Sequence, residues 1–163
     1  MRQDLITVLH KLAARQQAGE IFLDAIIIET TGMADPAPVA QTFLVDDQIK
    51  SFARLDGIVT LVDAKHVEQH LDEEKPDGVV NEAVAQVAFA DRLLLNKIDL
   101  VSAEDLDRVE ARLRGINSFA PIQRCRQSEV SVDRVLNIHG VDLHRVLRAA
   151  PGQLPAAPPP CCT

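Results

Sequence analysis

The pattern Asn-Lys-x-Asp occurs at Asn96, Lys97 and Asp99, directly after an apolar run. A carboxylate at Asp99 can accept two hydrogen bonds from guanine, one from its N1–H and one from its 2-amino group. Adenine offers no such pair of donors, so a site built on this carboxylate rejects adenine by leaving the carboxylate unpaired. The aliphatic part of Lys97 can lie over the base, and Asn96 can hold the loop together. The pattern predicts a guanine-binding loop; the alternative is an ordinary strand-to-helix turn.

A second polar group follows another apolar run, in the segment Ile26-Ile-Ile-Glu29-Thr-Thr-Gly32. An acid in this position resembles a Walker-B carboxylate, which orients Mg²⁺ or its water near a terminal phosphate. Gly32 has no Cβ and can bring its backbone N–H against that phosphate. We therefore predict a catalytic role for Glu29, exerted through Mg²⁺ from outside its first ligand shell, and a phosphate contact for Gly32. The alternative for Glu29 is a surface carboxylate at the end of a strand.

Apolar runs and amphipathic segments alternate along the chain, which predicts an α/β fold with a mostly parallel sheet and helices on both faces. The expected strands are residues 24–29, 56–63, 92–96 and 121–125. The expected helices are residues 4–17, 36–43, 64–71, 81–90, 102–114, 132–136 and 142–148. Ligands of such sheets bind beyond the carboxyl ends of the strands. Glu29 and residues 96–99 both fall at such ends, so we expect them to share one site.

The composition indicates an ordinary globular domain, because 47% of the 163 residues are hydrophobic and 25% are charged. The net charge of −7, without a basic run, argues against binding to nucleic-acid phosphates or to an anionic membrane. The absence of Trp and Tyr leaves no aromatic platform for exposed bases. No apolar run is long enough to span a bilayer, and no signal-peptide pattern is present. We therefore expect a soluble, cytoplasmic protein.

Residues that ligate metals are few and poorly spaced. Cys161 and Cys162 are adjacent on a Pro-rich segment and supply at most two of the four ligands of a closed zinc site. His66 and His70 are four residues apart on an expected helix but have no evident third ligand. We interpret the two cysteines as incidental and the two histidines as part of a solvated helix face. Cys125 is expected to be a small buried apolar residue.

Three segments closely resemble the CobW-like family of P-loop GTPases, which includes zinc metallochaperones and cobalamin-synthesis proteins. They are residues 24–41 (DAIIIETTGMADPAPVAQ), 55–63 (LDGIVTLVD) and 86–101 (QVAFADRLLLNKIDLV). The resemblance extends over residues 2–148, and its most specific piece is Glu-Thr-Thr-Gly-x-Ala-Asp-Pro.

The resemblance implies a P-loop NTPase-like fold with particular roles for the polar residues. Glu29 and Gly32 take the Walker-B and switch positions, and Asn96, Lys97 and Asp99 take the guanine-specificity positions. It also implies GTP and Mg²⁺ as cofactors, zinc in the full-length family, and a metal-requiring apoprotein as a partner.

The family's phosphate-binding loop, Gly-x-x-x-x-Gly-Lys-Ser/Thr, does not occur in this sequence. The strand before that loop, the Cys-x-Cys-Cys metal motif and the C-terminal domain of the family also have no counterpart. We therefore expect residues 1–150 to be a partial GTP-binding domain, truncated at both ends, and residues 151–163 to be a flexible tail.

The function expected from this resemblance is metal delivery or homeostasis, of zinc in the first place, by a GTPase. The isolated chain is expected to hydrolyse GTP negligibly, because the phosphate-binding Lys and the magnesium-binding hydroxyl are absent. The alternative is an inactive fragment that serves only as a protein-interaction module. An ATP-dependent enzyme is disfavoured by Asp99.

Overall fold

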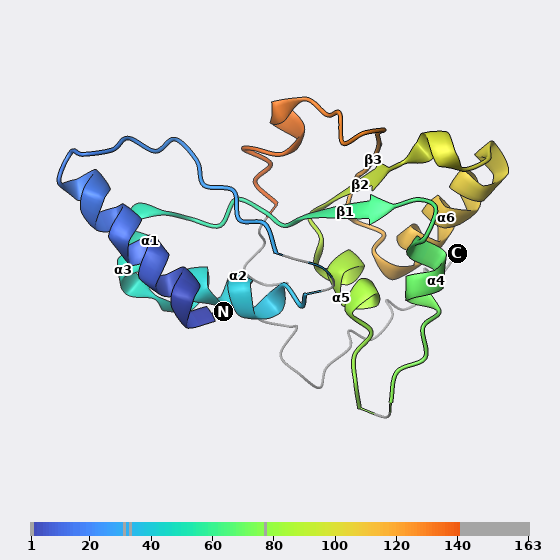
Figure 1. Ribbon diagram of the computed structural model, residues 1–163, viewed down its shortest axis with the longest axis horizontal. Helices are drawn as coiled ribbons and strands as arrows, with labels where there is room; N and C mark the ends of the chain where they lie inside the picture. Colours follow the sequence, from blue (N-terminus) through green and yellow to red (C-terminus); the bar gives the residue numbers. More distant parts are fainter. Residues whose placement is uncertain (1, 31, 33, 77, 141–163) are drawn as a thin grey trace, which may run out of the picture.

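The sheet has three parallel strands in the computed structural model, which describes residues 2–30, 32, 34–76 and 78–140. These strands are β1 (Val59–Asp63), β2 (Arg92–Asn96) and β3 (Ile122–Arg124), and they lie in the order β1-β2-β3. The register places Leu61 opposite Leu94 and Asp63 opposite Asn96. The carboxyl ends of β1 and β2 therefore meet at one edge of the sheet, as Figure 1 shows.

The larger hydrophobic core lies on one face of this sheet. Helices α4 (Val67–Leu71), α5 (Glu82–Phe89) and α6 (Ala103–Ile116) cover this face. The buried residues of α6 recur at the three- and four-residue spacing that places side chains on one helix face. They are Leu106, Val109 and Leu113, and they share this core with the strand residues Val62, Leu93 and Leu95. Fully burying an aliphatic side chain of this size contributes about 1.5–3 kcal/mol.

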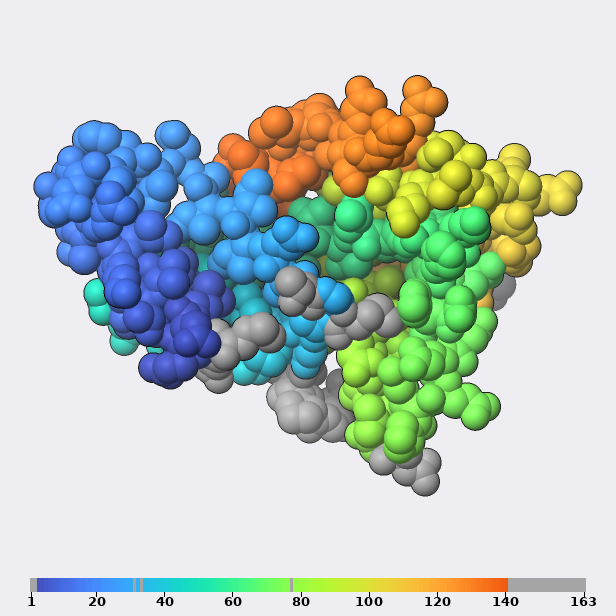
Figure 2. All heavy atoms as spheres, in the orientation of Figure 1, coloured from blue at the N-terminus to red at the C-terminus, as the bar shows by residue number. Residues whose placement is uncertain are grey.

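A second, smaller core lies at the other end of the molecule. It joins α1 (Arg2–Gln17), α2 (Ala37–Val45) and α3 (Asp47–Phe52) through Leu9, Phe43 and Ile49. Residues 53–58 connect this helical cluster to the sheet, because they lead from α3 into β1 (Figure 1). Residues 21–30 leave α1 and run toward the sheet, and the chain then returns to the cluster at α2 (Figure 1). The same two-part shape is visible on the surface, where the blue N-terminal residues and the green and yellow residues gather at opposite ends (Figure 2).

Side-chain caps mark where three of the helices begin. Ser102 Oγ accepts a hydrogen bond from the backbone N–H of Asp105, as the capping-box spacing predicts. The side chain of Asn81 accepts from two backbone N–H groups at the start of α5. The carboxylate of Asp46 accepts from the N–H of Ile49 and starts α3, a helix that the sequence analysis did not predict.

The strand expected at residues 24–29 does not form, so this prediction was wrong. The segment is extended but belongs to no sheet, and Ile27 is 70% exposed. Within the described part of the chain, its backbone makes no hydrogen bonds. A strand requires a hydrogen-bonded neighbour, and an apolar run alone does not supply one.

Most other expected elements are confirmed with shifted ends. Helix α4 begins at Val67 rather than at residue 64, and α6 continues through Gly115 to Ile116. The expected helix at 132–136 is a short 3-10 turn, η2 (Val132–Arg134). The helix expected at 142–148 and the tail expected at 151–163 lie outside the described residues. No described helix is both long and apolar enough to cross a membrane.

Candidate functional site

Asn96, the last residue of β2, connects that strand to the loop after β3. Its side-chain nitrogen donates to Ser128 Oγ over 3.0 Å, and its side-chain oxygen accepts from the Ser128 backbone N–H over 3.0 Å. Both Gln127 and Ser128 have positive φ angles, 51° and 58°, which non-glycine residues adopt infrequently. Asn96 is 7% exposed, so these bonds are shielded from water. The Asn96 side chain therefore holds residues 125–128 in an otherwise unfavourable shape.

Lys97 begins the turn that follows β2, in the left-handed conformation with φ 61°. Its Nζ donates to Asp63 Oδ2 at the end of β1 over 2.8 Å. This contact follows from the register, because Asp63 lies opposite Asn96 and Lys97 is the next residue. The position of the Lys97 ammonium group is thus set by the neighbouring strand.

Asp63 also accepts hydrogen bonds from His66 Nδ1 over 3.0 Å and from the Lys65 backbone N–H over 2.9 Å. Partial burial raises the pKa of Asp63, but the bonds from Lys97, His66 and Lys65 and the charge of Lys97 lower it by more, to about 2. Asp63 is therefore ionised at neutral pH and forms the negative centre of a small polar cluster.

Asp99 lies in the 3-10 turn η1 (Ile98–Leu100), two residues beyond Lys97. Its side chain is exposed and has no hydrogen-bond or ion-pair partner among the described residues. A carboxylate that is already paired must break bonds to accept a ligand. The Asp99 carboxylate is free to accept two donors at no such cost.

Gly32 lies across a small hollow from the end of β1. This hollow of about 260 Å³ is lined by Gly32, by the β1 residues Thr60–Asp63 and by α4 and α5. Gln86 of α5 fixes the loop on its far side, because Gln86 Nε2 donates to the carbonyls of Gly32 (3.2 Å) and Ala34 (2.9 Å). Gly32 has φ 63°, a conformation that favours glycine. The loop therefore brings Gly32 to the same edge of the sheet as Asp63.

Glu29 is exposed, lies on the extended segment rather than on a strand, and does not line this hollow. Mg²⁺ is usually held by one or two carboxylates together with phosphates and waters. Within the described residues no group of three or more His, Cys, Asp or Glu side chains could hold a metal ion. Glu29 offers one carboxylate, so the described residues do not build a magnesium site by themselves.

The other candidate ligands do not gather either. His66 is the N-cap of α4 and bonds to Asp63, and His70 lies near the end of that helix; both are exposed, as expected for a solvated helix face. Cys125 is buried, as expected, and burial raises the pKa of its thiol. Cys161 and Cys162 lie outside the described residues.

The sequence analysis missed three residues of this edge: Asp63, Gln86 and Ser128. Asp63 gave a usable signal, because an acid at the carboxyl end of a parallel strand is the same feature that selected Glu29. Ser128 and Gln86 gave none, since their partners lie 32 or more residues away in the chain.

A parallel sheet with polar residues gathered beyond its carboxyl ends is the arrangement of α/β nucleotide-binding domains. The comparisons with known proteins agree with this class. A family model described as "CobW/HypB/UreG, nucleotide-binding domain" matches residues 1–124, and the chain belongs to this family.

Curated relatives carry zinc in their names. The zinc-regulated GTPase metalloprotein activator 1 of Schizosaccharomyces pombe is 46% identical over 99 residues, covering 61% of this chain and 23% of that protein. The zinc chaperone YjiA of Escherichia coli is 34% identical over 122 residues, covering 75% of this chain and 36% of that protein. The chain therefore spans about a quarter to a third of the length of these relatives.

The fold has a match among solved structures. The crystal structure of the Zn(II)-bound YjiA GTPase from E. coli superposes with a TM-score of 0.69 at 32% identity, over 79% of this chain and 38% of that one. This likeness confirms the α/β fold with a parallel sheet, of the P-loop NTPase kind.

Proposed function

We propose that this chain is the guanine-binding part of a GTPase domain that serves metal delivery. Asn96, Lys97 and Asp99 bind the base of GTP, and Glu29 and Gly32 lie toward its phosphates. Residues 1–150 form this domain.

The observation that carries the proposal is the contrast between the fixed and the free members of the pattern. Asn96 and Lys97 are committed to Ser128 and Asp63, whereas the carboxylate of Asp99 has no partner among the described residues. Such an arrangement favours binding, because residues that are already held in place lose little conformational entropy when the ligand binds. The free carboxylate then accepts the guanine N1–H and 2-amino hydrogens.

The part of the site expected to contact the phosphates of GTP is less complete than the part expected to contact the base. Glu29 is exposed on the extended segment, the sequence has no Gly-x-x-x-x-Gly-Lys-Ser/Thr loop, and the described residues contain no group of three or more His, Cys, Asp or Glu side chains that could hold a metal ion. We therefore expect weak GTP binding by this chain, with base contacts dominant, and negligible hydrolysis. Glu29 is proposed to act only where phosphates and Mg²⁺ are held by further groups.

Metal delivery is proposed from the names of the relatives, which are a zinc-regulated metalloprotein activator and a zinc chaperone. In this proposal zinc is the cargo and a metal-requiring apoprotein is the recipient, in the cytoplasm. Switching between nucleotide states would bias a bistable loop that controls transfer of the metal.

The base assignment is tested by measuring the affinities for GTP, XTP and ATP with Mg²⁺ present, by ligand-observed NMR. The wild-type chain should prefer GTP over ATP. The Asp99→Asn variant should lose about ten- to a hundredfold in GTP affinity, because each polar group left unpaired in the complex costs roughly 1–3 kcal/mol. It should also gain preference for XTP, whose carbonyl replaces the 2-amino group and can accept from the Asn amide.

The matched control is Asp47→Asn, the same change at a carboxylate on α3 that is 93% exposed. This control should leave the GTP-to-ATP ratio unchanged. An Asp99→Asn variant with an unchanged GTP-to-XTP ratio would show that Asp99 does not bind the base. A wild-type chain that does not discriminate between GTP and ATP would instead favour the protein-interaction module.

A further inference from the structure

The carboxylate of Asp63 is oriented by residues that follow it closely in the chain. Its Oδ1 accepts from the backbone N–H of Lys65 over 2.9 Å, and its Oδ2 accepts from His66 Nδ1 over 3.0 Å. The bond to an N–H two residues further on is the Asx turn that Asp side chains commonly form. Both oxygens are therefore held at the end of β1 by local contacts, independently of the neighbouring strand.

The side chain of Lys97 is fixed at both of its ends. At one end the backbone begins η1 in the left-handed conformation, with φ 61°. At the other end Nζ donates to Asp63 Oδ2 over 2.8 Å, a contact that joins residues 34 positions apart. The methylene stem of Lys97 spans these two points. It has therefore already given up most of the rotamer freedom that a solvated Lys side chain keeps.

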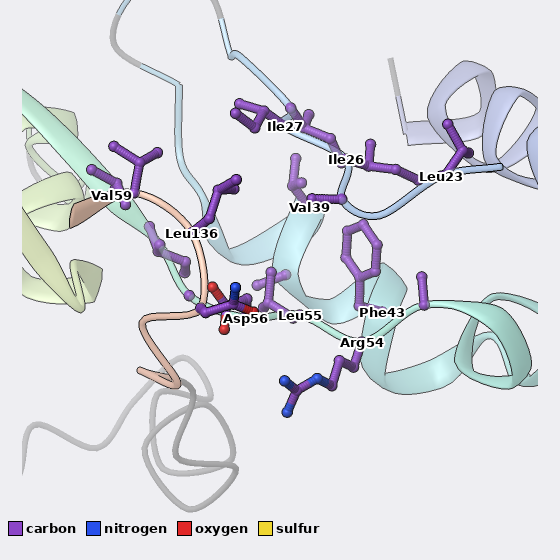
Figure 3. A pocket seen from close by; sticks show the side chains of 18 of the residues that line it. Leu23, Ile26, Ile27, Val39, Phe43, Arg54, Leu55, Asp56, Val59 and Leu136 are labelled. Atoms are coloured by element: carbon purple, nitrogen blue, oxygen red, sulfur yellow. The ribbon is translucent and has the colours of Figure 1, made fainter. Parts of the chain in front are cut away.

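The stem of Lys97 is nonetheless accessible. The side chain of Lys97 is 48% exposed, and that of Asp63 is 28% exposed. Figure 3 draws a different part of the molecule, the hollow between residues 23–28 and 53–59, so the pair lies apart from that hollow. Partial burial raises the pKa of Asp63, but its bonds from Lys97 and His66 lower it by more, to about 2, so the partner of Lys97 is charged at neutral pH.

We propose that Asp63 is a positioning residue of the guanine site, which holds the stem of Lys97 in place to cover the base without touching the nucleotide itself. The inference rests on the proposed function, in which Lys97 binds the base. Immobilising one long side chain on binding weakens affinity by about three- to tenfold. The bond to Asp63 removes this cost, because Lys97 is ordered in the unliganded chain.

The opposite role, in which Asp63 sequesters Lys97 from the ligand, predicts the opposite result. If Asp63 competed with the nucleotide for Lys97, its removal would strengthen binding. The geometry favours positioning, because the bond uses only the ammonium group of Lys97 and leaves the methylenes available for contact with a base.

The first test is the GMP affinity of the Asp63→Asn variant, measured by NMR titration of the nitrogen-15-labelled chain. We expect binding about three- to tenfold weaker than in the wild type. Asp56→Asn is the matched control, because Asp56 is 29% exposed and also accepts from backbone N–H groups, those of Ile138 and His139. It precedes β1 instead of ending it, so its replacement should change GMP affinity less than about twofold.

A double-mutant cycle then separates positioning from a general effect on the fold. Lys97→Met keeps an unbranched stem but removes the ammonium group that Asp63 holds. In this background Asp63→Asn should change GMP affinity by less than about twofold, because its effect is transmitted only through Lys97. A merely structural role of Asp63 would weaken binding in both backgrounds by the same factor.

The ratio of GMP to IMP affinity provides a second readout. IMP lacks the 2-amino group of guanine, so this ratio reports the contact assigned to Asp99. Asp63→Asn should leave the ratio unchanged while weakening the binding of both nucleotides. Asp99→Asn should lower the ratio.

The inference is overturned if Asp63→Asn binds GMP as tightly as the wild type or more tightly. It is also overturned if Asp63→Asn weakens binding equally with Lys97 and with Met at position 97. Either result leaves the guanine site intact as long as the wild type binds GMP through residues 97–100. A wild-type chain that does not bind GMP would instead refute the proposed function and this inference together.

Discussion

Replacing Asp63 by Asn should destabilise the protein by an amount that depends on pH. The carboxylate accepts hydrogen bonds from Lys97, His66 and the backbone N–H of Lys65, and its pKa falls from an ordinary 3.8 to about 2. A lowering of this size corresponds to roughly 2.5 kcal/mol of stability at neutral pH. Because Lys97 is about half exposed, solvent screening reduces this to about 1–2 kcal/mol.

The direction of the pH dependence follows from the direction in which folding shifts the pKa of Asp63. The folded-state pKa of Asp63 lies below the unfolded value, so its contribution is fully present above pH 3.8 and is lost as the pH falls toward about 2. The amide side chain of the Asp63→Asn variant cannot ionise, so the difference in stability between variant and wild type should vanish over the same range. Other carboxylates also titrate there, but they cancel in this difference.

Urea denaturation followed by far-ultraviolet circular dichroism measures this difference, since the chain has no Trp or Tyr for intrinsic fluorescence. We expect a gap of about 1–2 kcal/mol near pH 7 and almost none near pH 2. The Asp47→Asn control should show a gap of less than about 0.5 kcal/mol at either pH, because Asp47 is 93% exposed and its ion pair with Lys50 is screened by solvent. A gap of the same size at both pH values, or none near neutrality, would refute the account of the Asp63 cluster.

Three further outcomes are expected. Asn117→Ala should lower the free energy of unfolding by about 2–4 kcal/mol in the same urea assay, because it leaves the buried carbonyls of Val87 and Ala90 without their donor. A loss under about 1 kcal/mol would contradict this reasoning. Ser102→Ala should cost about 1 kcal/mol by removing the cap of α6, and Ser102→Thr, which keeps both the acceptor for Asp105 N–H and the hydroxyl donor to the Asp105 carboxylate, should recover most of it. Glu29→Gln should leave the GTP-to-ATP affinity ratio unchanged in the NMR assay, whereas a changed ratio would place Glu29 at the base instead of the phosphates.

The contrast between β2 and residues 24–29 shows how far sequence patterns reach. Both are short apolar runs, and both predicted a buried strand. The run at Arg92–Asn96 became β2 with the expected bounds, because β1 and β3 pair with it on both sides. The run at 24–29 has no such neighbours among the described residues. An apolar run indicates a tendency to be buried, whereas a strand also needs a partner that the local sequence does not specify.

The candidate site shows the same limit. The sequence predicted a guanine-binding role for Asn96, Lys97 and Asp99, because that pattern depends only on local spacing. It could not show that Asp63 fixes Lys97, because that contact depends on the register between two strands. Residue type alone also does not decide burial, since Phe119 is 82% exposed. Caps such as Ser102 were predictable, because donor and acceptor are three residues apart.

The central claim, that the loop after β2 binds a guanine base, is tested most directly by an NMR titration of the nitrogen-15-labelled chain with GMP and, separately, with AMP. These nucleotides probe the base site without requiring a complete phosphate site. The account predicts that GMP shifts the amide signals of residues 97–100 and 125–128, and that AMP at the same concentration does not. Equal shifts with both nucleotides, or GMP shifts confined to other parts of the chain, would contradict it.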